Sequence, residues 1–208
     1  MKVAILTNGS YGDYTFCNDI NSCNFVICAD NGLHHAKNLG ITPNFIIGDF
    51  DSVDNATLDE FRHIEIRRLN SIKDETDTEC ALDYAIEKGA TEVIIYGGVG
   101  SRFDHSLANV HLLVKALDNR VKAELRNEHN TIYITDNYIE IRGKIDDLIS
   151  LIPLTETVSG VDSTGLFYKL SNGSFKIGKP YGVSNYMTDY CATISLKSGK
   201  LLVIKTKD

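Results

Sequence analysis

Glu92-Val93-Ile94-Ile95-Tyr96-Gly97-Gly98, at residues 92–98, is an apolar run that ends in two glycines. An uninterrupted apolar run of this length is typical of a strand that is buried on both faces of a sheet. A helix-like stretch follows at residues 106–117. Its expected buried stripe consists of Leu107, Val110, Leu113, Val114 and Leu117. A buried strand, a glycine turn and an amphipathic helix in succession predict one unit of a parallel α/β sheet.

The same alternation of strands and helices extends over residues 1–123. Further strand-like runs occur at residues 3–6, 25–29, 45–47 and 64–68. A short helix is expected at residues 33–39, and a better marked one begins at the capping-box pattern Thr76-x-x-Glu79 and ends at Gly89. These elements predict a mostly parallel α/β domain over residues 1–123, which would bind its ligand outside the carboxyl ends of the strands.

The pattern changes after residue 123. Helix signals disappear, and short strand-like runs separated by turn residues take their place. These runs lie at residues 131–134, 138–141, 148–152, 175–177, 192–196 and 201–205. Many short strands at this spacing are typical of a small antiparallel β-sandwich. We therefore expect a second domain, a β-sandwich, over residues 124–208.

The composition limits the class of protein. The chain has 208 residues, of which 43% are hydrophobic and 24% charged, which is ordinary for a globular protein and excludes a disordered or coiled-coil chain. The net charge of −7 argues against a nucleic-acid partner, because nucleic acids usually bind a basic surface. No apolar run reaches the roughly 20 residues that cross a membrane, and residues 1–9 are too short and too polar for a signal peptide. Five cysteines without a C-x-x-C pair favour reduced thiols in a cytoplasmic protein.

Two acidic clusters lie at the ends of expected elements. In Gly48-Asp49-Phe50-Asp51-Ser52, two carboxylates follow a buried strand and would repel each other unless a cation such as Mg²⁺ lies between them. The alternative is an acidic turn in which Asp51 or Ser52 caps the next helix. Lys73-Asp74-Glu75-Thr76-Asp77 combines one cation with three carboxylates at a helix start, where the helix dipole also gives Asp77 a structural alternative.

A third cluster follows the strand at residues 92–96. In the stretch from Gly97 to His105, glycines would let backbone N–H groups approach phosphates, Arg102 would fork onto phosphate oxygens, and Asp104 would bind metal. His105 would bind phosphate or shuttle a proton. The alternative is an ordinary turn that Asp104 or Ser106 caps. Because all three clusters face one crevice, together they predict a site for a polyphosphate and Mg²⁺.

An ordered set of segments resembles the thiamine pyrophosphokinase family. The segments in the first domain are Cys28-Ala29-Asp30-Asn31-Gly32, Pro43 to Ser52, Lys73 to Asp77 with Ala81-Leu82, and Ser101 to His105 with Leu107-Ala108-Asn109. Those in the second are Ser163 to Leu170 and Gly182-Val183-Ser184-Asn185. The resemblance covers nearly the whole chain. Asn31 and Ser101 depart from it, since each stands where the family usually has glycine, and Asn31 would then need a less easy turn with positive φ.

The resemblance implies a homodimer in which ATP and Mg²⁺ occupy the α/β crevice and thiamine lies between the protomers. The hydroxyethyl oxygen of thiamine would attack the β-phosphorus of ATP and release AMP. The positions that align with Mg²⁺ ligands are Asp49, Asp51, Asp77 and Asp104. Contacts to ATP would come from Asp30, Asn31, Lys73, Arg102, Asp104 and His105, and contacts to thiamine from Ser184 and Asn185. Catalytic roles are expected for Arg102 and His105, and for Asp74 or Asp77 as the group that accepts the hydroxyl proton.

Three other functions stay open at this point. Asp49-Phe50-Asp51-Ser52-Val53 fits the D-x-D motif of haloacid-dehalogenase-like phosphatases, in which Asp49 would be a covalent nucleophile. That motif normally opens its domain, whereas two strands precede it here. A D-x-D sugar-nucleotide transferase would leave the cluster at Arg102 unexplained. A non-catalytic nucleotide or thiamine sensor would not need four placed carboxylates.

Overall fold

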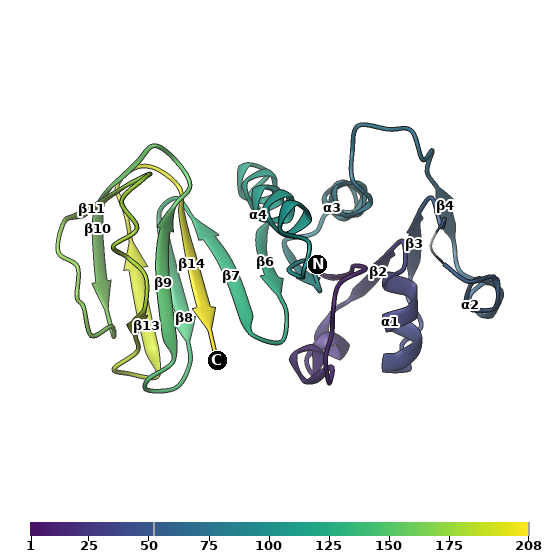
Figure 1. Cartoon of the computed structure of the whole chain (residues 1–208), viewed down its shortest axis with the longest axis horizontal. Helices are drawn as coiled ribbons and strands as arrows, with labels where there is room; N and C mark the ends of the chain where they lie inside the picture. The colour runs from purple at the N-terminus through teal and green to yellow at the C-terminus, as the bar shows by residue number, and fades with distance from the viewer. Residues whose placement is uncertain (52, 208) are drawn as a thin grey trace. The chain divides into compact units, whose positions relative to one another are not determined.

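The computed structural model describes residues 1–51 and 53–207 (Figure 1). The chain divides into two compact units, Met1–Glu128 and His129–Asp208. The division lies five residues beyond the expected position at 123, because β6 (Lys122–Arg126) pairs with β5 (Glu92–Tyr96) and so belongs to the first unit. Among the described residues, no helix is both long enough and apolar enough to cross a membrane.

The first unit is built on a parallel sheet. Its strands follow the order β6-β5-β1-β2-β3-β4, and each described pair of neighbours is parallel. The remaining bounds are β1 Lys2–Leu6, β2 Phe25–Ala29, β3 Phe45–Gly48 and β4 Ile66–Arg68. The expected mostly parallel α/β domain is therefore confirmed.

Helices cover both faces of this sheet. Their bounds are α1 Gly32–Leu39, α2 Asn55–Glu60, α3 Asp77–Glu87 and α4 Phe103–Asp118, and two short 3₁₀ turns lie at η1 Thr15–Cys17 and η2 Ile20–Ser22. On one face Leu33 of α1 packs with Ala4 and Ile46, while on the other Tyr84 of α3 stacks on Phe45 with ring centroids 3.8 Å apart. Alternate residues of the central strands thus point to opposite helical layers, which explains why β1, β2, β3 and β5 are apolar along nearly their whole length.

The helix starts agree with the sequence in one case and differ in another. Thr76 caps α3 as expected, because its side chain accepts a hydrogen bond from Glu79 N at 3.1 Å. Helix α2 is capped by Asp54, whose carboxylate accepts from Thr57 N at 2.8 Å, so the expected cap at Asp51 is wrong. Ser52, the other expected cap, lies outside the described residues. Asp51 is therefore left for another role.

Helix α4 begins three residues earlier than expected, and its buried stripe differs. The buried positions are Ser106, Asn109, Leu112, Leu113 and Ala116. Leu107, which was expected in the stripe, is 44% exposed. The helix is rotated so that two polar side chains, Ser106 and Asn109, face inward at its first turns. The sequence missed this because an apolar stripe was assumed to be the buried one.

The second unit is a sandwich of two antiparallel sheets. One sheet has the order β12-β9-β14-β7 and the other β11-β10-β13-β8. The bounds are β7 Asn130–Thr135, β8 Tyr138–Arg142, β9 Leu148–Pro153, β10 Thr157–Thr164, β11 Gly173–Lys176, β12 Asn185–Tyr186, β13 Cys191–Ser195 and β14 Leu201–Thr206. Side chains of both sheets share one core that includes Ile149, Val203, Phe175 and Ile194. The expected β-sandwich is confirmed.

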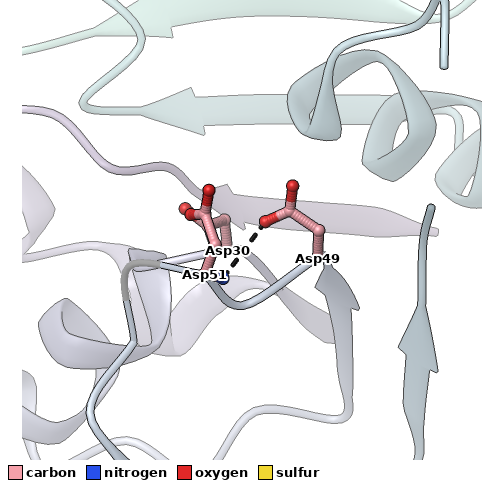
Figure 2. Close-up of side chains that lie close together, drawn as sticks. All are labelled: Asp30, Asp49 and Asp51. Carbon is pink, nitrogen blue, oxygen red and sulfur yellow. Dashed lines mark hydrogen bonds between the residues drawn. The ribbon is translucent and has the colours of Figure 1, made fainter. Parts of the chain in front are cut away.

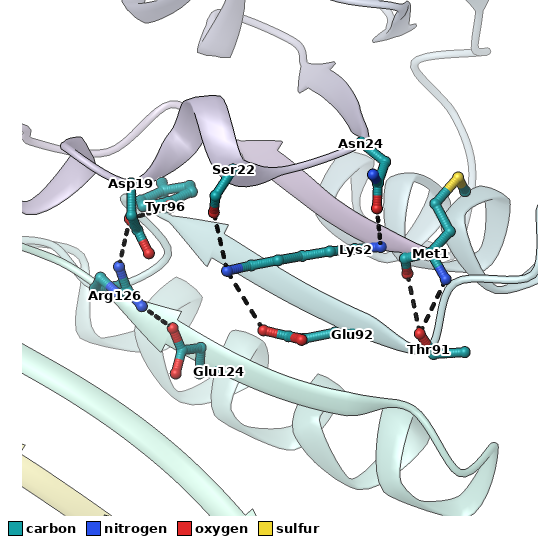
Figure 3. A network of polar contacts seen from close by, with 10 residues as sticks. All are labelled: Met1, Lys2, Asp19, Ser22, Asn24, Thr91, Glu92, Tyr96, Glu124 and Arg126. Atoms are coloured by element: carbon teal, nitrogen blue, oxygen red, sulfur yellow. Dashed lines mark hydrogen bonds and ion pairs between the residues drawn. The ribbon is translucent and has the colours of Figure 1, made fainter. Parts of the chain in front are cut away.

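A polar network joins the segment around Asp19 to the sheet of the first unit (Figure 3). Arg126 donates to Asp19 Oδ1 at 2.7 Å and pairs with Glu124, and Tyr96 donates its hydroxyl to Asp19 at 2.8 Å. Burial alone would raise the pKa of Asp19, but the bonds from Arg126 and Tyr96 hold that pKa below its usual value. Burial raises the pKa of Glu124 despite the neighbouring Arg126. Arg126 thus compensates two carboxylates at once.

Candidate active site

A cavity of about 670 Å³ lies at the carboxyl ends of β1, β2, β3 and β5. Residues from all three clusters that the sequence singled out line it. The lining includes Thr7, Asn8, Gly9, Ser10, Asp30, Asp49, Lys73, Asp77, Gly97, Gly98, Gly100, Ser101, Arg102, His105 and Asn109. The expected meeting of the clusters in one crevice is therefore found, and the loop after β1, residues 7–10, is an addition that sequence reasoning missed. Gly9 and Ser10, two small residues shortly after a buried strand, were the signal in the sequence that could have revealed this loop.

Three carboxylates lie close together, as Figure 2 shows, and two of them, Asp30 and Asp49, line this cavity, whereas Asp51 is not among its described lining residues. Asp30, Asp49 and Asp51 each offer an oxygen atom, and these atoms lie within 4.8 Å of one another. Asp49 Oδ1 also accepts a hydrogen bond from Asp51 N at 3.2 Å. Asp30 was expected to contact ATP, and its place in this acidic group was not foreseen. Three hard oxygen donors at this spacing fit a divalent cation such as Mg²⁺.

Two left-handed residues bring these carboxylates together. Phe50 has φ +61° and is only 6% exposed, so its ring is anchored in the core between the two aspartates. Asp30 has φ +49°, whereas Asn31 has φ −68°. The positive φ that was expected at Asn31 thus lies one residue earlier. Gly48 is required beside it, because a Cβ there would lie 2.9 Å from Asp30 Cα.

Lys73 and Asp77 form an ion pair on the wall of the cavity. Lys73 Nζ lies 3.1 Å from Asp77 Oδ1. Burial raises the pKa of Asp77, and the charges of Asp30 and Asp49 add to the shift, against the opposing effect of Lys73. Burial would lower the pKa of Lys73, but Asp77 and Asp49 raise it overall. Asp74 is exposed and is not among the described residues that line the cavity.

Arg102 and Asp104 pair with each other at the start of α4. Arg102 Nε donates to Asp104 Oδ1 at 3.2 Å, and its Nη2 donates to Oδ2 at 2.5 Å. These hydrogen bonds from Arg102 lower the pKa of Asp104 to about 2. Asp104 and Asp77 both lie outside the group of three carboxylates found among the described residues. Arg102 and His105 line the cavity as expected.

The two inward polar residues of α4 hold the glycine loop after β5. Asn109 donates its amide to Gly98 O at 2.7 Å, and Ser106 Oγ accepts from Gly100 N at 3.0 Å. Ser106 Oγ also lies 3.0 Å from Arg102 O. The alternative in which Asp104 or Ser106 caps α4 is not found, since the N-cap is Arg102 without a side-chain cap bond. The glycine loop is instead held by hydrogen bonds to Ser106 and Asn109, two side chains of the helix that follows it.

The second unit contains its own cavity, of about 550 Å³. It is lined by Leu151, Tyr168, Leu170, Phe175, Tyr181, Gly182, Val183, Ser184 and Asn185. Tyr181 stacks on Phe175 with ring centroids 4.9 Å apart, and the cavity thus has an aromatic wall. Asn185 is 6% exposed, accepts from Tyr168 N at 3.0 Å and donates to Tyr168 O at 2.9 Å. Both residues expected to contact thiamine, Ser184 and Asn185, therefore line this cavity.

Fold and site together define a class of protein. A parallel α/β unit with acidic, cationic and glycine-rich walls around one cavity is suited to holding phosphate groups and a divalent metal. A β-sandwich with an aromatic cavity is suited to a flat organic ring. This combination is typical of an enzyme that transfers phosphate groups.

Comparisons with known proteins identify the family. Residues 16–125 match the model "Thiamin pyrophosphokinase, catalytic domain", and residues 136–201 match "Thiamin pyrophosphokinase, vitamin B1 binding domain". A thiamine pyrophosphokinase of Bacillus subtilis is 32% identical over 88% of this chain and 87% of its own. The crystal structure of thiamine pyrophosphokinase from Bacillus subtilis has a TM-score of 0.90 at 27% identity with both chains fully covered. That of the Geobacillus thermodenitrificans protein has a TM-score of 0.86 at 27% identity, covering 100% of this chain and 98% of that one.

The chain therefore belongs to the thiamin pyrophosphokinase family, a family of thiamine diphosphokinases. The family resemblance that the sequence motifs carry is confirmed. The phosphatase and sensor alternatives are not favoured, because both halves of the chain match models of this one family.

Proposed function

We propose that this chain transfers the pyrophosphoryl group of ATP to thiamine. The hydroxyethyl oxygen of thiamine attacks the β-phosphorus, the bond from that phosphorus to the oxygen bridging it to the α-phosphorus breaks, and AMP leaves with that oxygen. The observation that carries the proposal is the pair of cavities, one charged and one aromatic, each within the segment that matches the corresponding family domain.

Asp30, Asp49 and Asp51 are the residues that would hold Mg²⁺. Their carboxylate oxygens offer the hard donors that Mg²⁺ prefers, at mutual distances within 4.8 Å. When bound, the ion would offset the negative charge of the phosphates. The set proposed from the family resemblance included Asp77 and Asp104 in place of Asp30. The bond of Asp104 to Arg102 favours the set with Asp30.

Cations and backbone donors surround the place where the phosphates of ATP would bind. Lys73, Arg102 and His105 line the cavity together with the glycine loop at residues 97–100. The fork of Arg102 matches phosphate oxygens, while Lys73 supplies a point charge. Asn31 reaches the cavity wall indirectly, through its bond to Asn8 Oδ1 at 3.0 Å. These groups would position the triphosphate and stabilise the charge that develops on the leaving AMP.

Asp77 is our proposed proton acceptor. It lines the cavity, and burial raises its pKa, which makes its carboxylate a stronger base than that of an ordinary aspartate. Asp74, the other candidate, is exposed and lies outside the described lining of the cavity. Asp77 would take the proton that the thiamine hydroxyl loses as its oxygen bonds to phosphorus.

The aromatic cavity is the proposed place for thiamine. Thiamine would contact Ser184, Asn185 and the ring of Tyr181. A tyrosine supplies the stacking surface because the chain has no tryptophan.

Exposed aromatic side chains support a homodimer. Phe167, Tyr168 and Tyr181 are 53%, 63% and 58% exposed. Large exposed aromatic groups are typical of an interface, which supports a homodimer. The five free cysteines support a cytoplasmic location.

Asn185→Ala is expected to raise the KM for thiamine about tenfold and to leave the KM for ATP within about twofold. The reason is that Asn185 is buried and its side chain is hydrogen-bonded to both the N–H and the C=O of Tyr168. Steady-state kinetics with each substrate varied in turn measure the effect. Asn137→Ala, at an exposed turn residue of the same unit, is the matched control. Equal changes in both KM values would contradict this assignment of the aromatic cavity.

Product analysis tests the proposed function directly. The protein is incubated with ATP, Mg²⁺ and thiamine, and the nucleotides and thiamine species are resolved, with thiamine omitted in a control. We expect AMP and thiamine diphosphate in equal amounts, dependent on both thiamine and Mg²⁺. ADP with thiamine monophosphate would move the attack to the γ-phosphorus. Release of inorganic phosphate without a thiamine product would favour the phosphatase alternative instead.

A further inference from the structure

Beside the charged cavity lies a buried aromatic pair that belongs to none of the motifs singled out in the sequence. Tyr11 and His35 stack with ring centroids 3.7 Å apart and an interplanar angle of 16°. Tyr11 is 3% exposed and His35 9%. Neither side chain is among the described residues that line the cavity. The pair comes from two elements, the segment after β1 and helix α1.

Tyr11 supports the turn that begins the glycine loop after β5. Its hydroxyl donates to Tyr96 O at 2.8 Å and accepts from Thr7 N at 3.2 Å, so it joins the ends of β1 and β5. Its ring fills the space beside Gly97, where a Cβ would come within 2.3 Å of it. Gly97 has φ +72°, and the turn therefore depends on both a glycine and the ring beneath it.

His35 holds the loop after β1. Its ring is hydrogen-bonded to the backbone of Gly9, and its Nδ1 lies 2.9 Å from the hydroxyl of Tyr14. Asn38 Nδ2 donates in turn to Tyr14 at 2.7 Å. Burial lowers the pKa of His35 to about 4, so the ring is neutral at pH 7. The Tyr14 hydroxyl accepts from Asn38 and therefore donates to Nδ1, which leaves Nε2 as the N–H donor of the neutral imidazole.

The two loops also touch each other directly above this pair. A Cβ at Gly9 would lie 1.9 Å from Gly97 O, so the backbones are in contact at these glycines. Both loops line the charged cavity. The first contributes Asn8, Gly9 and Ser10, and the second contributes Gly97, Gly98, Gly100 and Ser101. A shift of Tyr11 or His35 would therefore displace backbone N–H groups on both walls of the charged cavity.

We infer that Tyr11 and His35 are positioning residues that set the spacing of the two loops around the phosphates of the nucleotide. The role rests on the proposed function, because it presumes that ATP binds in the charged cavity. The pair acts by fixing backbone N–H groups before the ligand arrives, which reduces the ordering that binding would otherwise require. Its contribution is thus to nucleotide affinity, and the cavity of the other unit is not part of it.

His35→Phe is the decisive variant, since it keeps a ring to stack on Tyr11 and removes the bond to Gly9. We expect the dissociation constant for ATP, measured by calorimetry without thiamine, to rise about tenfold, with the KM for thiamine changed less than about twofold. His35→Gln, which keeps an N–H donor, should recover part of the affinity. His34→Phe, at the exposed neighbouring position, is the matched control.

Hydrogen exchange of the ligand-free protein provides the second readout. In His35→Phe, peptides covering residues 7–10 and 97–100 should exchange faster, while peptides of β2 and β3 keep their protection. Unchanged ATP affinity with a lower melting temperature would overturn the inference and leave His35 a structural residue. Equal rises in both substrate constants would overturn it too. Failure of the wild-type protein to bind ATP would instead refute the proposed function, and exchange in the two loops would still decide whether His35 holds them.

Discussion

Asp49→Asn is expected to lower the turnover of thiamine diphosphate formation about a thousandfold and to leave the fold intact. Asp49 lines the charged cavity, and its carboxylate oxygen lies within 4.8 Å of those of Asp30 and Asp51. The substitution removes one negative charge and almost no volume. The amide oxygen still accepts the bond from Asp51 N, which stabilises the turn at Phe50. The loss should therefore appear in metal binding and turnover, and not in the melting temperature.

Two measurements separate a metal ligand from a residue that only shapes the turn. The dissociation constant for Mn²⁺, followed by electron paramagnetic resonance in the absence of ATP, should rise at least about tenfold in Asp49→Asn. Asp59→Asn removes the same charge from an exposed position of α2 and is the control. Wild-type Mn²⁺ affinity in Asp49→Asn would remove Asp49 from the proposed ligand set.

The same assay distinguishes the two proposed ligand sets. If Asp30, Asp49 and Asp51 hold the metal, Asp51→Asn should weaken Mn²⁺ binding much more than Asp104→Asn, because Asp104 is bonded to Arg102. The set that the family resemblance implied gives equal losses for the two variants. A stronger effect at Asp104 would mean that the metal binds at Asp104, which Arg102 must then release.

Sequence patterns were sufficient for the first five strands of the parallel sheet and for the position of the cavity. An apolar run such as residues 92–96 has no stable place except between two helical layers, and the residue after each parallel strand lies at one edge of the sheet. The order of strands and turns along the chain therefore sufficed to place Asp30, Asp49 and Gly97 together. The β-sandwich followed from the spacing of short strands in the same way.

Other features depended on backbone conformation, which residue patterns do not reveal. Strand β10 escaped notice because its pairing with β11 shifts between Ser159 and Val161, where Gly160 has φ +66° and breaks the alternation of side chains. Asp30 joined the acidic group through its own left-handed φ and the close approach of Gly48. Tyr11 and His35 lie far apart in sequence, and only tertiary packing brings their rings together beside the glycine loops.

Arg126→Met is expected to lower the free energy of unfolding by about 3–5 kcal/mol, the usual loss when one partner of a buried ion pair is removed. The side chain of Arg126 is 19% exposed, that of Glu124 16% and that of Asp19 34%. Methionine keeps an unbranched aliphatic side chain, so the change removes chiefly the charge, its hydrogen bonds and the guanidinium that lies over the Tyr96 ring. For a chain of this size the loss corresponds to a melting temperature roughly 6–20 °C lower, which circular dichroism measures.

Arg142→Met is the matched control, because Arg142 also pairs with a glutamate but is 83% exposed. Its expected loss is at most about 1 kcal/mol.

The stability deficit of the Arg126 variant is expected to depend on pH because of Glu124. Burial already raises its pKa, and removing Arg126 leaves that effect unopposed, so the charged form is disfavoured in the folded state. The deficit should therefore be full at pH 8 and shrink toward pH 5 as Glu124 takes up a proton. A deficit that is the same at both values would mean that lost packing, and not an uncompensated carboxylate, is what Arg126 prevents.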